Sequence, residues 1–169
     1  MKKILPILTF MTFISLYCQE KCSAIIDWKY LETIDIYDHP NGTIIHQMKN
    51  DSINEDFLHL DIFDFTDTHF NVSIRMTIKK DSATGWIKKA DYIGAFKRHE
   101  KFPMDLTLYT DKKVLESNKF IVKNWTPGLL TIENYEGDWI FISLTQNGKI
   151  YKGWIQENEL CANAYSTCS

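Results

Sequence analysis

The segment Gly85–Ile93 (GWIKKADYI) decides the fold, because the chain repeats its pattern 68 residues later as Gly153–Cys161 (GWIQENELC). Upstream, Thr33–Tyr37 (TIDIY) recurs 72 residues later as Asp105–Tyr109 (DLTLY). A pattern kept in order over about 60 residues is the sequence signature of a duplicated structural unit. We therefore predict two copies of one small unit, joined near residues 96–103.

Within each copy, apolar residues recur at every second position. In Leu58–Ile62 three apolar side chains alternate with two polar ones, and Phe70–Arg75 follows the same rule. This period of two is expected of a strand with one face on a core. Asn147-Gly148 separates two such runs, and this dipeptide readily forms a tight hairpin turn. Because no long segment has the apolar stripe of an amphipathic helix, the sequence predicts an all-β fold.

The N-terminus has the features of an export signal. Lys2 and Lys3 precede an apolar run from Ile4 to Tyr17, as in a signal peptide. The run is about 14 residues long, shorter than the roughly 20 that a membrane-spanning helix needs. We therefore predict a signal peptide over residues 1–18, no transmembrane segment in the mature chain, and a periplasmic or secreted protein. An alternative is a lipoprotein attached through Cys18.

The charge of the mature chain argues against a nucleic-acid partner. Removing residues 1–18 takes away two lysines and no acidic residue, which leaves 17 basic and 22 acidic groups and a formal charge of −5. Nucleic-acid binding is driven by basic surfaces. We therefore do not expect the mature chain to bind nucleic acid.

Three cysteines remain after cleavage, in a compartment where disulfides persist. A bridge between Cys161 and Cys168 would fasten the C-terminal tail. A bridge from Cys22 to either of them would tie the two ends of the chain together. The sequence leaves these alternatives open.

The repeated pattern resembles the bacterial SH3-like (SH3b) domain family over nearly all of the mature chain. The resemblance is carried by Ile36-Tyr37 and Leu108-Tyr109 in the opening strands and by the two Gly-Trp-Ile segments. It implies an all-β protein with two tandem SH3-like β-barrels after the signal peptide. The implied divisions are a first barrel at 25–94, a linker at 95–103, a second barrel at 104–162 and a tail at 163–169.

The resemblance also implies a targeting or recognition module, often for cell-wall material or peptides in exported proteins. Such modules commonly accompany a catalytic domain, and we identify none in this sequence, so we expect recognition of an envelope component or another exported protein. Proline-rich ligands need aromatic-lined slots. Where polyproline-binding SH3 domains supply a proline and a tyrosine, this chain has Lys88 and Asp91 in one copy and Gln156 and Glu159 in the other. A polyproline ligand is therefore not expected.

Aromatic residues are the candidate ligand-binding site. Trp86 and Trp154 are expected to fill the barrel cores. Trp139 follows a turn rich in glycine and acid, and with Tyr109 and Tyr135 it could form an aromatic shelf of the kind found in recognition surfaces. The repeat aligns Trp139 with Phe70, and Tyr37 takes the place of Tyr109 in the first copy. The alternative is that Trp139 packs against the other barrel.

Metal binding and catalysis are the competing interpretations. Nearby histidines and carboxylates suit zinc and related ions, and they are His59, Asp61, Asp64, Asp67 and His69. The sequence shows no catalytic acid–base pair and no nucleophile motif. We therefore predict a non-catalytic binding protein with no metal or cofactor. The alternatives are a secreted inhibitor or immunity-type protein that blocks an enzyme, and a metal-dependent hydrolase.

Overall fold

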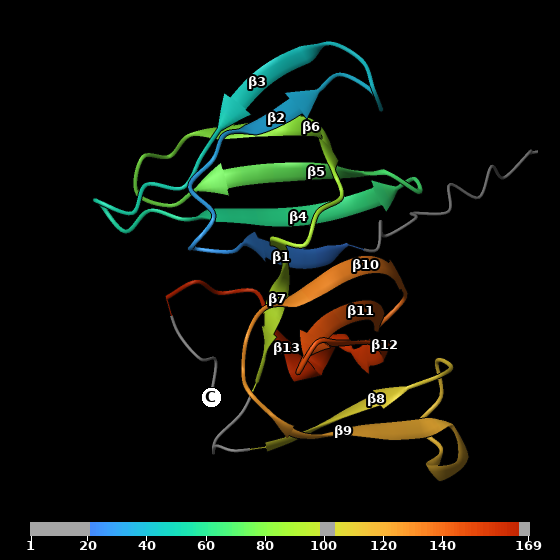
Figure 1. Ribbon diagram of the computed structural model, residues 1–169. Coiled ribbons are helices and arrows are strands. Elements are labelled where there is room, and N and C mark those ends of the chain that lie inside the picture. The colour runs from blue at the N-terminus through green and yellow to red at the C-terminus, as the bar shows by residue number, and fades with distance from the viewer. Residues whose placement is uncertain (1–20, 99–103, 166–169) are drawn as a thin grey trace, which may run out of the picture.

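The computed structural model describes residues 21–98 and 104–165, and it is built from antiparallel strands (Figure 1). The strands are β1 (Cys22–Ile26), β2 (Ile34–Tyr37), β3 (Ile44–Met48), β4 (Leu58–Phe65), β5 (His69–Met76), β6 (Ser82–Lys88), β7 (Ile93–Lys97), β8 (Met104–Tyr109), β9 (Lys119–Trp125), β10 (Leu130–Glu136), β11 (Trp139–Gln146), β12 (Lys149–Gln156) and β13 (Leu160–Cys161). Two short 3-10 turns, η1 (Glu116–Asn118) and η2 (Glu157–Glu159), complete them. The predicted all-β class is confirmed.

Some of the predictions fall on residues that the structure does not describe. The signal peptide at 1–18 and the lipidation alternative at Cys18 lie outside the described residues. So does Cys168. Within the described part of the chain, no helix is long and apolar enough to span a membrane.

The described strands join in a single sheet. Its order is β3-β2-β6-β5-β4-β1-β7-β10-β11-β12-β8-β9, and β13 pairs with β7 beside this path. The order β3-β2-β6-β5-β4-β1 of the first half recurs in the second half as β9-β8-β12-β11-β10-β7. Figure 1 shows the first half above and the second half below, with β7 running between them. The hydrogen-bonded path is not closed, because it ends at β3 and β9.

Strand β7 lies where we predicted a linker between two separate barrels, and it joins the two halves into one sheet. It pairs with β1 through Ile25 and Gly94, and with β10 through Leu130 and Ala95. It also pairs with β13. Residues 95–97, which we expected in a linker, therefore belong to a strand that both halves share. The segment of the second half that matches the start of β7 is β13, and it pairs with β7 itself.

A continuous core runs through both halves. Buried side chains of β1, β4, β5 and β6 belong to the same apolar cluster as those of β7, β10, β11 and β12. Across the junction, the Phe65 ring lies 5.5 Å from the Tyr135 ring, and Lys89 Nζ donates a hydrogen bond to the Glu133 carbonyl at 2.7 Å. The two halves therefore form one packed body rather than two independently moving domains.

The two Gly-Trp-Ile segments place glycine, not tryptophan, against the core. Gly85 and Gly153 are buried at the points where β2 meets β6 and β8 meets β12. A Cβ on Gly85 would lie 2.7 Å from the Tyr37 carbonyl oxygen, and one on Gly153 would lie 3.0 Å from the Tyr109 carbonyl oxygen. Only glycine allows so close a backbone approach.

The expectation that Trp86 and Trp154 fill the barrel cores is wrong. Both side chains are only half-buried, whereas the residues on either side of each tryptophan are buried. Successive side chains in a strand point to opposite faces. Since Gly85 and Ile87 face the core, Trp86 must lie on the outer face, and Trp154 does so for the same reason.

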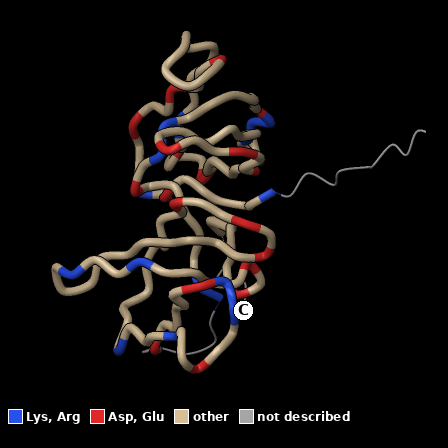
Figure 2. Tube along the Cα trace, turned by 90° about the vertical axis from the view of Figure 1, so that its right-hand side faces the viewer, with Lys and Arg blue, Asp and Glu red and all other residues tan. Residues whose placement is uncertain are grey.

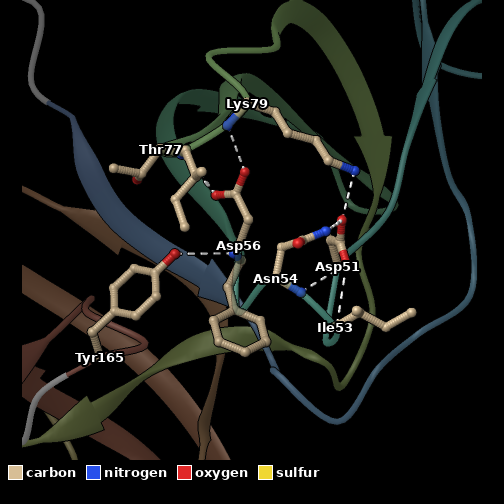
Figure 3. Close-up of polar contacts among 9 residues, drawn as sticks. Asp51, Ile53, Asn54, Asp56, Thr77, Lys79 and Tyr165 are labelled. Atoms are coloured by element: carbon tan, nitrogen blue, oxygen red, sulfur yellow. Dashed lines mark hydrogen bonds and ion pairs between the residues drawn. The ribbon is translucent and has the colours of Figure 1, made fainter.

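The polar segment at residues 49–56, between β3 and β4, supports the turn between β5 and β6. The fully buried carboxylate of Asp56 accepts hydrogen bonds from three backbone N–H groups, those of Thr77 (2.9 Å), Ile78 (3.0 Å) and Lys79 (2.8 Å). Figure 3 shows Asp56 pointing into this turn. Beside it, Asp51 forms an ion pair with the Lys79 ammonium at 2.6 Å.

Candidate functional site

The structure brings two of the predicted site residues together. Tyr109 is the last residue of β8 and Trp139 the first residue of β11. Their rings meet edge to face, with centroids 5.5 Å apart and an interplanar angle of 84°. Both side chains are half-buried. This geometry is a favourable one for aromatic pairs, and it leaves part of each ring accessible.

Tyr135, in contrast, lies on the other face of the sheet. Its partner across the strand pair is Ile140, which faces the core, and its ring packs against Phe65. The cause is an irregularity in β10 between Ile132 and Asn134. A bulge of this kind adds one residue and reverses the faces of the side chains that follow. The prediction that Tyr135 joins the aromatic shelf is therefore wrong.

Two aromatic residues that we did not assign to the site complete it. Phe141 and Trp154 are partners across β11 and β12, with ring centroids 5.1 Å apart. Trp154 is also the cross-strand partner of Tyr109. We call Tyr109, Trp139, Phe141 and Trp154 the aromatic face. The signal for Phe141 was present in the sequence, because it stands two residues after Trp139 in the same strand.

Charged side chains border the aromatic face. Lys112, in the loop after β8, places its ammonium group 5.3 Å from the centre of the Trp154 ring. The same ammonium group forms an ion pair with Glu136. Cations are attracted to the face of tryptophan. Figure 2 shows that residues of both signs are interspersed along both halves of the chain.

The first half carries the same arrangement with different side chains. The rings of Tyr37 and His69 meet edge to face at 5.9 Å and 90°. His69 pairs with Lys88 as Trp139 pairs with Gln156. The counterpart of Trp139 is therefore His69. The alignment with Phe70 was wrong by one residue, because Phe70 pairs with the buried Ile87 and itself faces the core.

In the first half, the ring of His69 takes the position that Trp139 has in the second half. It is 1% exposed, and its Nδ1 lies 2.8 Å from the Thr68 hydroxyl. Burial, with a smaller contribution from the Lys88 charge, lowers the pKa of His69 below its usual range. Tyr37 occupies the position that corresponds to Tyr109, but its partner is a buried imidazole rather than a half-buried indole.

The residues considered for a metal site do not converge. Within residues 21–98 and 104–165, no three His, Cys, Asp or Glu side chains lie close enough to hold an ion. His59 stacks on Tyr165, with ring centroids 5.8 Å apart. Asp61 forms ion pairs with Arg75 at 2.9 Å and Lys21 at 3.2 Å.

The two described cysteines differ in state. Cys22 is a free thiol in the core, and its burial, together with the nearby charge of Glu157, raises its pKa. Cys161 is disulfide-bonded. The alternatives in which Cys22 forms a bridge are therefore wrong.

Comparison with known proteins adds little. No protein-family model matches this sequence, and no curated protein matches it. Among solved structures, the chain is similar to NlpC1 from Trichomonas vaginalis, with 14% sequence identity and a TM-score of 0.32. The match covers 91% of this chain and 50% of NlpC1, so the chain spans half the length of that protein. A likeness this weak establishes neither a family nor a function.

Proposed function

We propose that this protein is an exported, non-catalytic recognition protein that binds its partner through the aromatic face of the second half. The proposed partner is a component of the cell envelope, either cell-wall material or a peptide, or another exported protein. The observation that carries the proposal is the gathering of Tyr109, Trp139, Phe141 and Trp154 on one outer face of the sheet.

Aromatic side chains with a polar border are typical of binding surfaces. Tyrosine and tryptophan present a large apolar area at a small cost in conformational entropy, and they are enriched among the residues that dominate binding energy. Here four aromatic rings, three of them from tyrosine or tryptophan, are held by backbone pairing within β8, β11 and β12. Because the strands fix these side chains before a ligand arrives, less entropy is lost on binding. Lys112 and Glu136 provide charge at the edge of the same surface.

The two halves would then have different tasks. In the first half, the place of Trp139 is filled by the buried His69, and the place of Phe141 is filled by Asn71. An imidazole and an amide offer a partner less apolar area than two large rings. This difference supports a division in which the second half binds and the first half supports it.

The test compares single aromatic substitutions at equivalent positions of the two halves. Trp154→Ala removes a ring of the aromatic face, and Trp86→Ala removes its counterpart in the first half. Binding is measured to purified cell wall and to proteins from an envelope extract, with a thermal melt of each variant. If Trp154 is a binding hot spot, its loss costs about 2 kcal/mol, or roughly 30-fold in affinity, and Trp86→Ala leaves affinity unchanged.

Equal affinity of both variants for an identified partner would overturn the proposal. If the partner is an enzyme whose activity falls on binding, this protein is an inhibitor that acts through its aromatic face. This is the inhibitor alternative given in the sequence analysis.

A further inference from the structure

The chain beyond β13 reaches the first half, and Tyr165 attaches it there. The Phe57 N–H donates a hydrogen bond to the Tyr165 hydroxyl at 3.1 Å, between residues 108 positions apart in the sequence. The Tyr165 ring packs against the Phe57 ring, with centroids 5.6 Å apart, and stacks on the imidazole of His59 at 5.8 Å. Figure 3 shows Tyr165 pointing towards the backbone next to Asp56. We call residues 162–165 the C-terminal segment.

His59 lies on the face of β4 that points away from the main core. Its neighbours Leu58 and Leu60 are buried in that core, so the side chain of His59 takes the opposite face. On this face its cross-strand partner in β1 is Ile25, which is fully buried although it lies outside the main apolar cluster. The outer face is therefore covered at β1 and β4, and Tyr165 forms part of the cover.

Burial leaves one imidazole nitrogen of His59 without a partner. Its Nε2 is buried and has no hydrogen-bond partner. When an imidazole is protonated, both of its ring nitrogens carry a hydrogen. A protonated His59 would therefore place an N–H group here without an acceptor, and a buried donor without an acceptor is unfavourable. The docked C-terminal segment thus favours the neutral ring.

The charged groups around His59 act in both directions, and burial outweighs them. Burial is the largest cause that lowers the pKa of His59, and the charge of Arg75, its cross-strand partner in β5, lowers it further. A backbone hydrogen bond with Ala162 and the carboxylates of Asp56 and Asp61 act in the opposite direction. Asp61 already pairs with two cations, and Asp56 already accepts three backbone hydrogen bonds. The partner that β1 places beside the imidazole carries no charge.

We propose that His59 is a pH-sensitive switch for the C-terminal segment, which is docked on β4 when the imidazole is neutral and released when the imidazole takes up a proton. Release exposes the ring to water, where its pKa returns towards the ordinary value of about 6.5. The released state then binds a proton more readily than the docked state, so a fall in pH through and below this value favours release. The inference does not depend on the aromatic face, because Phe57, His59 and Tyr165 do not belong to that face.

Hydrogen exchange of the Phe57 amide measures release in the full mature protein. This N–H loses its acceptor when Tyr165 leaves, so it exchanges through a local opening. We expect its protection factor, corrected for the intrinsic exchange rate, to fall about three- to tenfold between about pH 7.5 and about pH 5.5. The upper value applies if only the released ring takes up a proton in this range.

Variants assign the effect to one histidine. His59→Gln removes the titrating group, so the protection of Phe57 should change by less than about twofold over the same range. His69→Gln is the matched control, because His69 also has a buried Nε2 without a partner but its ring meets Tyr37 instead. This control should keep the fall in protection. Trp154→Ala, which tests the proposed function, should keep it as well.

Tyr165→Ala tests the reciprocal effect. If docking disfavours the protonated ring, the loss of docking must raise the pKa of His59, since the coupling between two equilibria is reciprocal. Titration of the His59 ring by NMR should therefore show a higher midpoint in Tyr165→Ala than in the parent protein. This measurement decides the question even if His59→Gln releases the segment at every pH.

Any of three results would overturn the inference. The first is a Phe57 protection factor that is equal within about twofold at the two pH values in the parent protein. The second is a fall in His59→Gln as large as in the parent protein. The third is titration of His59 at the same pH with and without Tyr165.

Discussion

Replacing Gly94 by alanine should weaken the junction between the two halves more than any change at an open glycine. Gly94 lies in β7, where it pairs with Ile25 of the first half and Thr131 of the second. A Cβ at this position would overlap the carbonyl oxygen of Leu130 and lie 2.9 Å from Leu129 Cγ. The carbonyl oxygen belongs to the backbone of β10, so it cannot rotate away, and one strand must shift.

The expected loss of stability follows from these contacts. Overpacking a well-filled site costs about 1 to 3 kcal/mol. A shift of β7 away from β10 would also weaken backbone hydrogen bonds worth about 1 kcal/mol each. We therefore expect Gly94→Ala to lower the free energy of unfolding by about 3 kcal/mol, a large share of the stability of a typical domain.

Urea unfolding, followed by tryptophan fluorescence, measures this loss. The matched control is Gly128→Ala, because a Cβ on Gly128 would meet nothing within 4 Å. This control should change the free energy of unfolding by no more than about 0.5 kcal/mol. If the two variants unfold at the same urea concentration, β7 and β10 are not packed as closely as the structure shows, and the account of the shared strand fails.

Three further predictions concern other parts of the fold. Asp56→Asn should destabilise the protein by about 1 to 3 kcal/mol in the same urea assay, because an amide nitrogen cannot accept the backbone hydrogen bond from Lys79; unchanged stability would show that the turn does not need the carboxylate. Trp86→Ala should cost less than the roughly 3 to 5 kcal/mol of a buried tryptophan, because its side chain is half-buried; a loss of that full size in a thermal melt would place it in the core. Since the folded state holds His69 with a lowered pKa, the unfolded chain binds more protons as the pH falls past the ordinary histidine value of about 6.5, so stability should decrease as the pH is lowered through and below that value. His69→Gln should reduce this drop, and an equal drop in both proteins would assign it to other groups.

The sequence by itself determined the class of fold and part of the site. The alternation in Leu58–Ile62 is a local pattern, and local patterns fix which residues can form a half-buried strand. The pairing of Tyr109 with Trp139, and the matching place of Tyr37, could be predicted because each of these residues ends or begins a strand at the same point of the repeat.

Only the tertiary structure decided which strand edges pair with each other and which strand faces point away from the core. Strand β7 serves both halves through contacts between residues far apart in the chain, which no local pattern encodes. One extra residue in β10 moved Tyr135 to the core side, since the faces of a strand alternate and any irregularity reverses them. The close backbone approach at Gly85 and Gly153 put the neighbouring tryptophans outside. As a result, Trp154 is part of a surface rather than a core.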